Sequence, residues 1–156
     1  MYKFMIILLC FSGTGCVSKY TAPEGVPLAN VKYISHFSVR AGLLTLSTGV
    51  WSYENSNCTS KSIVGSVKGS QKKPGEIEIK AEAGKLLYNT YAVPVRDLNT
   101  VGGLRYKYHA TRFMPEYGKE YEIEIFRNRM ARVHEVSNGV KKPVYNDVPK
   151  NEICRP

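Results

Sequence analysis

Apolar and polar residues alternate along most of this chain, which is the pattern of β-strands with one buried face. The clearest case is 76–83, where Ile or Ala occupies the odd positions and Glu or Lys the even ones. The same alternation predicts strands over 29–40, 43–51, 62–67 and 86–95. No stretch of ten or more residues has the period of an amphipathic helix, and the sequence contains no internal repeat. These features predict a mainly β domain.

Two later segments, 104–111 and 121–125, alternate in the same way. We predict that they pair as an antiparallel hairpin, in the register that sets Lys107 opposite Glu124. A pair of opposite charges across two strands contributes about 0.2–1 kcal/mol, so this register satisfies the polar face.

A second hairpin is predicted near the end of the chain, where 130–136 and 140–144 flank Ser137-Asn138-Gly139. Asn-Gly is the strongest short-range hairpin signal, because both residues tolerate the positive φ angles of a tight primed turn. The segments give about eight short strands, so we expect an all-β, mainly antiparallel β-sandwich of immunoglobulin-like or transthyretin-like type. The tail after 146 is irregular.

The first 15 residues have the layout of an export signal. Lys3 precedes an apolar run over 4–11, and small residues occupy 12–15. The run is much shorter than the roughly 20 residues that a membrane-spanning helix needs. We therefore predict that residues 1–15 are a signal peptide that is removed.

The segment Gly13-Thr14-Gly15-Cys16 resembles the lipobox at which bacterial lipoproteins are cleaved and acylated on cysteine. It departs from that pattern at Gly13, where Leu or another apolar residue is usual. The alternative is an ordinary signal-peptidase cut after Gly15, which would release a soluble exported protein.

Cysteine counting favours lipidation of Cys16 with palmitate-type chains. Cys10 leaves with the signal, so an acylated Cys16 leaves Cys58 and Cys154 as a pair. An unmodified Cys16 would instead add an odd thiol in an oxidising compartment. A Cys58–Cys154 disulfide would fasten the tail and, in the chain-entropy model, stabilise the fold by about 4–5 kcal/mol.

Composition divides the chain into a signal (1–15), a flexible tether rich in Ser, Thr, Pro and Gly (16–28) and one β-sandwich domain (29–156). The whole chain has 22 Lys and Arg against 13 Asp and Glu, a formal net charge of +9, and removal of Lys3 lowers it by one. A basic exported domain favours anionic surfaces such as lipopolysaccharide phosphates, acidic glycans or acidic proteins. Basicity that only serves solubility is the alternative.

The sequence contains no recognisable catalytic or metal-binding pattern. His36, His109 and His134 lie on predicted strands without the spacing of metal ligands. Ser70-Gln71-Lys72-Lys73 fits the S-x-x-K pattern of penicillin-binding enzymes, but Pro74-Gly75 follows at once and prevents the helix which that chemistry needs. We therefore expect a protein that is not an enzyme, without metal or cofactor, and because it is exported we do not expect nucleic acid as a partner.

Tyrosines and basic residues suggest a binding surface. Eleven Tyr is a high number for 156 residues, and Tyr beside Arg or Lys is common at recognition surfaces. Tyr106 and Tyr108 are predicted to face the core. The residues predicted to form a binding patch, at the tip of the first hairpin and beyond it, are Arg112, Tyr117, Lys119, Arg127, Arg129 and Arg132. The alternative is an ordinary polar surface.

The chain as a whole resembles the many small uncharacterised lipoproteins of Gram-negative bacteria. The resemblance rests on the signal with Cys16, on the Pro-rich entry at 20–25, and on 113–121, which is similar to the Pro-x-x-Gly-x-x-Tyr turn of many β-sandwich domains. It implies a β-sandwich held at the cell envelope by an N-terminal lipid. Val17 after the cysteine is similar to sequences sorted to the outer membrane, which implies a location at its periplasmic face.

Three functional hypotheses follow. The first is a lipid-anchored, non-enzymatic periplasmic lipoprotein that binds or scaffolds an envelope partner. The second is an inhibitor or adaptor that binds an acidic envelope protein or an anionic polymer such as lipopolysaccharide or an acidic glycan; a cationic target such as lysozyme fits a basic chain poorly. The third is a hydrolase, which would need a histidine beside a nucleophile in a cleft.

Overall fold

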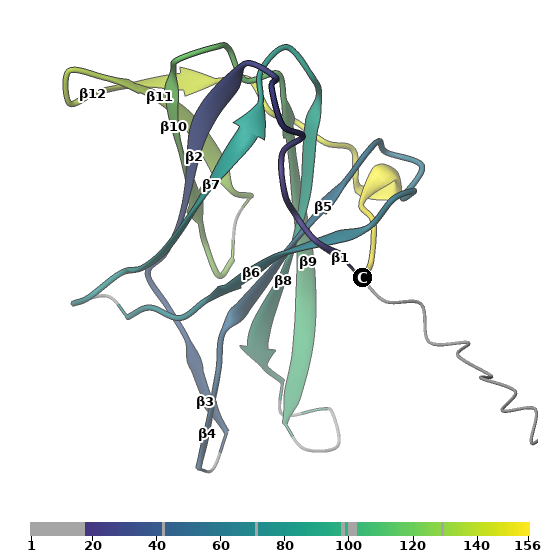
Figure 1. Ribbon diagram of the computed structural model, residues 1–156. Helices are drawn as coiled ribbons and strands as arrows, with labels where there is room; N and C mark the ends of the chain where they lie inside the picture. Colours follow the sequence, from purple (N-terminus) through teal and green to yellow (C-terminus); the bar gives the residue numbers. More distant parts are fainter. Residues whose placement is uncertain (1–17, 42, 71, 98, 100–102, 129) are drawn as a thin grey trace, which may run out of the picture.

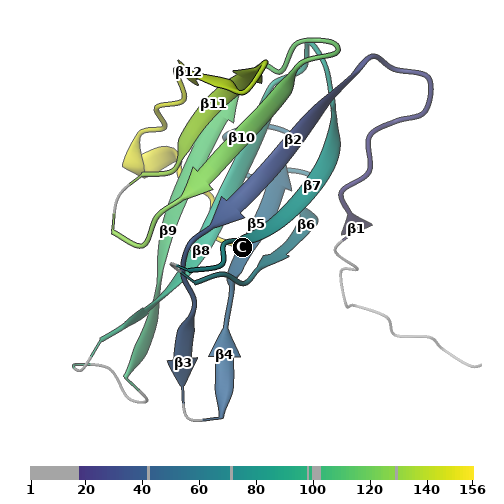
Figure 2. The same cartoon turned by 90° about the vertical axis from the view of Figure 1, so that its left-hand side faces the viewer.

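The computed structural model describes residues 18–156 except 42, 71, 98, 100–102 and 129. Two five-stranded sheets pack against each other, and a separate hairpin extends from one end (Figures 1 and 2). Sheet A contains, in spatial order, β1 (Ser18–Lys19), β6 (Ser62–Val67), β5 (Thr48–Tyr53), β8 (Leu87–Arg96) and β9 (Leu104–Phe113). Sheet B contains β12 (Val140–Val144), β11 (Arg132–Ser137), β10 (Glu120–Ile125), β2 (Leu28–Ser35) and β7 (Gly75–Glu82). The extending hairpin is β3 (Val39–Ala41) and β4 (Leu44–Leu46), and a 3-10 turn, η1 (Lys150–Glu152), precedes the C-terminus.

The predicted all-β sandwich is confirmed, with two differences in detail. Twelve strands occur among the described residues instead of about eight, because two- and three-residue segments also pair. The pairings are mainly antiparallel, but β1 runs parallel to β6 and β10 runs parallel to β2. Both sheets are therefore mixed.

The core lies between the sheets and consists of alternate residues from each strand. Val31 and Tyr33 of β2 and Ile123 of β10 are fully buried, in one cluster with Tyr91 and Val93 of β8. Side chains of this size contribute about 1.5–3 kcal/mol each when they leave water. The Tyr33 and Tyr91 rings meet across the core with their centroids 6.3 Å apart.

The C-terminal hairpin forms as predicted. β11 and β12 pair in antiparallel register around Asn138 and Gly139. Their φ angles are 50° and 77°, which is the left-handed conformation that a two-residue primed turn requires. The signal is local, so the sequence alone was sufficient to identify it.

The predicted hairpin between 104–111 and 121–125 is wrong, because β9 and β10 belong to different sheets. Lys107 of β9 lies opposite Val93 of β8, and Glu124 of β10 lies opposite Arg132 of β11. The connection after β9 carries the chain from sheet A to sheet B (Figure 1). The alternation of both segments was correct, but alternation does not identify the partner of a strand.

The N-terminal segment is less free than predicted. β1 pairs with β6, and the Tyr20 N–H donates a hydrogen bond to the Ile63 carbonyl at 2.8 Å. The Tyr20 ring also packs against the core. Residues 18–20 are thus held to sheet A rather than forming a tether. The predicted signal and Cys16 lie outside the described residues, and no helix in the described part of the chain is long and apolar enough to cross a membrane.

The C-terminal segment, residues 146–156, lies across the outer face of sheet A and is fastened there by the predicted Cys58–Cys154 disulfide. Val148 and Cys154 are buried against Tyr88 of β8 and Ala110 of β9. The Tyr88 hydroxyl donates a hydrogen bond to the Glu152 carbonyl. This segment covers only part of the face, which leaves the remainder open.

Candidate functional site

The open part of the outer face of sheet A forms a groove of about 690 Å³. The inward residues of β8 include Tyr91 and Val93, so the alternate residue Ala92 faces outward, together with its β9 neighbour Tyr108. We call this hollow the aromatic groove. It is lined by Ser47, Gly49, Trp51, Lys61, Ile63, Gly65, Ser66, Ala92, Tyr106, Tyr108 and Pro156.

Small residues make room for the aromatic rings of the groove. A Cβ atom at Gly49 would lie only 2.2 Å from Cη2 of Trp51, so the indole lies directly over the glycine backbone. Ala92 is the β8 partner of Gly49 and continues the floor toward Tyr108. Tyr106 at the far side keeps 47% of its surface exposed. The groove therefore offers ring surfaces to solvent over a floor without bulky side chains.

A second hollow lies beside the groove and shares Tyr106 and Tyr108 with it. Its other lining residues are His109, Ala110, Asn128, Met130, Val148, Lys150, Asn151, Ile153 and Arg155. The Arg155 guanidinium lies 5.9 Å from the centroid of the Tyr108 ring, within the range of a cation–π interaction. With Lys61, the two hollows have three cationic lining residues and no Asp or Glu.

His109 is half-buried beside this second hollow. Burial lowers the pKa of His109 below its ordinary value of 6.5, and the nearby charge of Lys107 lowers it further. The imidazole is therefore neutral at neutral pH. None of the residues that line the hollow with it is Ser, Cys, Asp or Glu.

The outer face of sheet B has a different character, because its charges are paired across strands. Lys141 Nζ lies 2.6 Å from a carboxylate oxygen of Glu122 and 3.0 Å from one of Glu124. Partial burial acts to raise the pKa of Glu124, but the hydrogen bond and charge of Lys141 outweigh it, so the pKa is lowered. The hydrogen bond from Lys141 to Glu122 raises the pKa of Lys141 despite its partial burial.

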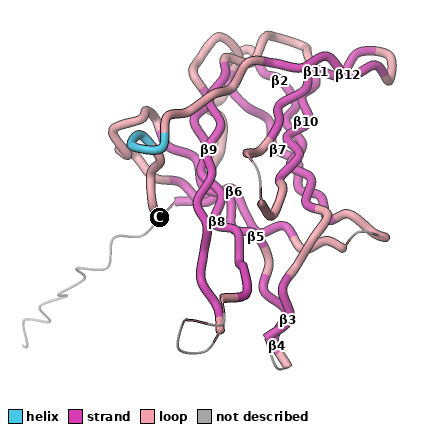
Figure 3. Tube along the Cα trace, turned by 180° about the vertical axis from the view of Figure 1, so that it is seen from behind, coloured by secondary structure: helices cyan, strands magenta, loops and turns pink. Residues whose placement is uncertain are grey.

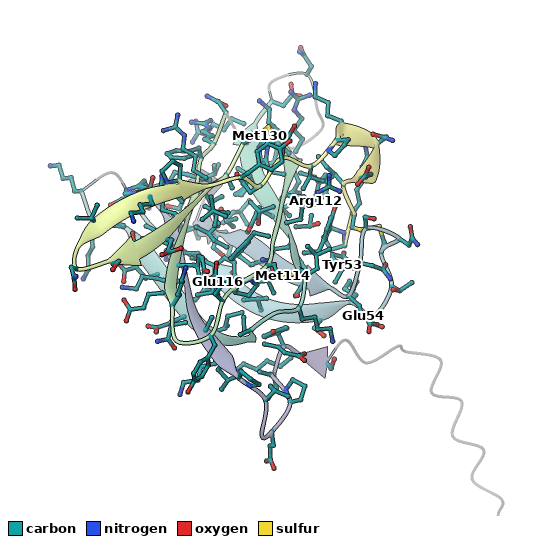
Figure 4. The ribbon with its side chains drawn as sticks, turned by 90° about the horizontal axis from the view of Figure 1, so that it is seen from above. Tyr53, Glu54, Arg112, Met114, Glu116 and Met130 are labelled. Carbon is teal, nitrogen blue, oxygen red and sulfur yellow. A yellow bond between two sulfur atoms is a disulfide. The ribbon has the colours of Figure 1, made fainter. Side chains whose placement is uncertain are left out.

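The five described residues of the predicted patch are not brought together into one surface. Arg112 forms an ion pair of 2.8 Å with Glu152 of the C-terminal segment, and Figure 4 shows it apart from Glu116. Lys119 is neutralised by Glu116 at 2.8 Å and by Glu135 at 3.1 Å. The pairing with these acids raises the pKa of Lys119. Arg112 and Lys119 are therefore already paired with carboxylates of this protein.

The remaining patch residues lie at both ends of β10. Tyr117 precedes the strand and is 76% exposed, whereas Arg127 follows the strand. Arg132 begins β11 and lies 5.7 Å from the centroid of the Phe126 ring. Arg129 lies outside the described residues. Six strand residues separate the two groups, so they do not form one surface.

Sequence reasoning missed the aromatic groove because it placed Tyr106 and Tyr108 in the core. Phe113 is buried in the core at the other end of β9, which sets the odd positions inward and the even positions outward. In the first half of β9 the inward positions hold the polar residues Arg105, Lys107 and His109, which are exposed or only half-buried. Alternation alone did not reveal which face was inside. The parity of Phe113 was the available signal.

The other chemical candidates of the sequence lie at separate places. Ser70 and Lys73 close an exposed turn in which the Ser70 N–H donates to the Lys73 carbonyl at 2.8 Å. His134 lies opposite Glu122 in the β10–β11 register, where Lys141 engages the carboxylate. Within the described ranges, no group of three or more His, Cys, Asp or Glu is arranged to hold a metal ion.

Comparison with known proteins gave no relative: no protein-family model, no curated protein and no solved structure matches this chain.

Proposed function

We propose that this protein is a non-enzymatic binding module of the bacterial envelope, anchored by a lipid on Cys16, and that its aromatic groove binds an anionic glycan. The observation that carries the proposal is the combination of exposed aromatic rings with three cations and no acidic residue in the adjoining hollows. The net positive charge of the whole chain favours the same class of ligand.

The chemistry of sugars supports a glycan as the ligand. A pyranose ring has apolar C–H faces and a polar rim of hydroxyl groups. The C–H faces fit the rings of Trp51 and Tyr106, and the acidic groups of a charged glycan fit Lys61, Lys150 and Arg155. Ser47 and Ser66 of the groove hydrogen-bond to each other, and each hydroxyl oxygen keeps a lone pair that can accept a hydrogen bond from a sugar hydroxyl group.

An acidic peptide fits the groove less well. Peptides usually bind to a sheet through its backbone at a free edge. β5 and β8 lie inside sheet A and are paired on both sides, so their backbone groups are already hydrogen-bonded. The floor formed by β5 and β8 therefore offers side chains, and a peptide that paired through its backbone would lie along β9, the edge strand of sheet A, instead of across the groove.

The proposed anchor agrees with the position of β1. Only Val17 lies between Cys16 and the strand that is held to sheet A, so a lipid on Cys16 would keep the sandwich close to the bilayer. Intact mass of the membrane-extracted protein tests this part. A mature chain that starts at Cys16 with acyl mass supports it, and a Cys16→Ser variant that remains in the membrane fraction contradicts it.

Trp51 provides a direct test of the groove because it is the only tryptophan of the chain. We would titrate residues 17–156, which contain every strand of both sheets, with a polyuronic acid and with a neutral glucan of equal length, and follow tryptophan fluorescence. We expect a saturable change with the acidic polymer, weakened by salt because charged contacts are screened. No change with either polymer would refute glycan binding.

Variants separate the groove from the patch that the sequence suggested. Tyr106→Ala should weaken binding about tenfold or more, as loss of an aromatic anchor does. Tyr117→Ala is the matched control, because Tyr117 is exposed on the β9–β10 connection outside the groove. Loss of binding in Tyr117→Ala with full binding in Tyr106→Ala would move the site to that connection. Capture of an acidic protein by the groove, without glycan binding, would favour the adaptor hypothesis instead.

A further inference from the structure

The β3–β4 hairpin extends away from both sheets, and its tip is apolar. All three ribbon and tube views show it beyond the end of sheet B, at the same end of the molecule as the β8–β9 end of sheet A (Figures 1, 2 and 3). Leu43 is 97% exposed and Leu44 is 68% exposed, the largest exposures among the leucines described. Two adjacent leucines at a projecting tip are unfavourable in water, because burial of their surface would be stabilising.

The body of the protein supports the base of the hairpin but not its tip. Val39 at the base is buried, with 4% of its surface exposed. The Arg96 guanidinium of β8 donates a hydrogen bond of 3.1 Å to the Arg40 carbonyl of β3. A two-stranded hairpin is marginally stable in water by itself, so a second contact at the tip would be favourable.

The charges behind the tip are positive. Arg40 and Arg96 are both exposed, and in the described part of the chain neither forms an ion pair with a carboxylate. Asp97, next to Arg96, is engaged by Arg105 at 3.1 Å. The hairpin thus has an apolar end followed by cationic side chains, which is the order of groups that a bilayer interface with anionic headgroups accepts.

We propose that the β3–β4 hairpin inserts into the surface of an anionic lipid bilayer. Leu43 and Leu44 enter the boundary between headgroups and acyl chains, and Arg40 and Arg96 contact lipid phosphates. A bilayer is favoured over a protein partner because the exposed apolar surface of the tip is small, formed by Leu43 and Leu44, and is followed directly by the exposed cations Arg40 and Arg96. This contact is separate from the glycan groove and is independent of it.

The hairpin also complements the proposed anchor. An acyl chain on Cys16 would hold the domain near the membrane and raise the effective concentration of a weak second contact. Two contacts fix the orientation of the sandwich, whereas one leaves it free to rotate. The insertion itself does not require the lipid, so it can be measured without it.

The test is co-sedimentation of residues 17–156 with vesicles of phosphatidylglycerol and phosphatidylethanolamine, and with vesicles of phosphatidylcholine alone. We expect the protein to bind the anionic vesicles, and to bind the neutral vesicles at least tenfold more weakly. Leu43→Asp should reduce binding to the anionic vesicles about tenfold or more. Val140→Asp is the matched control, because Val140 is 59% exposed beside another hairpin turn.

A second measurement reports insertion directly. Leu43→Cys labelled with an environment-sensitive fluorophore should give blue-shifted emission on anionic vesicles and should be quenched by lipids that carry a shallow nitroxide. Equal loss of binding in Leu43→Asp and Val140→Asp, or an unshifted label on bound protein, would overturn the proposal. Circular dichroism confirms that each variant is folded. The vesicles contain no glycan, so failure here leaves the groove proposal intact.

Discussion

The strands of both sheets show the same alternation of residues, but the outer faces of the two sheets differ in polarity. On sheet B, acidic and basic side chains of neighbouring strands neutralise each other, as in the Glu122–Lys141–Glu124 group. This polar face can therefore remain in contact with water. On sheet A, outward positions hold aromatic and small residues. The C-terminal segment covers part of them, and the aromatic groove is the part it leaves open. A sandwich thus needs a cover only where its outer face is apolar, and an uncovered remainder is available to a ligand.

The largest effect on stability should come from removing the disulfide that holds the C-terminal segment on sheet A. Cys58 and Cys154 are 96 residues apart, so the double variant Cys58→Ser, Cys154→Ser should lose about 4–5 kcal/mol of unfolding free energy. Denaturant unfolding of residues 17–156 measures this, and reduction of the wild-type protein should give the same loss. A loss below about 1 kcal/mol would mean that the segment is held by packing against Tyr88 alone.

The next effect concerns the floor of the groove. Gly49→Ala places a Cβ against the Trp51 indole, so we expect a loss of about 1–3 kcal/mol from overpacking and a shift in tryptophan emission. The effect should vanish when the same change is made in a Trp51→Ala background, because the clashing ring is gone. An equal loss in both backgrounds would place the strain in the strand rather than under the ring.

A smaller effect is expected on sheet B. Lys141→Ala leaves Glu122 and Glu124 without their shared cation, and exposed pairs of this kind contribute about 0.2–1 kcal/mol. Because the pKa of Glu124 is lowered in the folded state, this contribution is present at neutral pH and is lost as the pH falls through the acidic range. Lys142→Ala is the control. A loss that persists unchanged at pH 3 would not be electrostatic.

The smallest effect should be the acid sensitivity of His109. Its pKa lies below the ordinary value in the folded state, so the unfolded chain binds this proton first. The stability is therefore complete above about pH 6.5 and decreases as the pH falls below it. His109→Gln should flatten the melting temperature between pH 7 and pH 5. An identical slope in the variant and the wild type would show that the decrease comes from other groups.

Local signals in the sequence predict the structure correctly where neighbours in the chain are also neighbours in space. The Asn138-Gly139 turn and the alternation of 76–83 are of this kind. The disulfide was predicted by a different route, since the expected removal of Cys10 and acylation of Cys16 would leave Cys58 and Cys154 as a pair. Each of these conclusions needed only the residue types and their spacing.

The candidate site could not be found in the same way. The charge of Arg112 is neutralised by Glu152, 40 residues later, so counting nearby basic residues overestimated the patch. The predicted burial of Tyr106 and Tyr108 is wrong because alternation defines two faces of a strand without identifying which one is buried. β9 was paired with β10 because no local feature shows that the chain changes sheets between them.

The sequence by itself determined that this protein is a disulfide-bonded β-sandwich, because strand periodicity, tight turns and cysteine chemistry act over short ranges or through residue type alone. Only the tertiary structure decided which strands are neighbours, which cations remain unpaired and which aromatic rings face solvent. Those properties depend on contacts between residues that are distant in the chain, and many such contacts are compatible with one pattern of alternation.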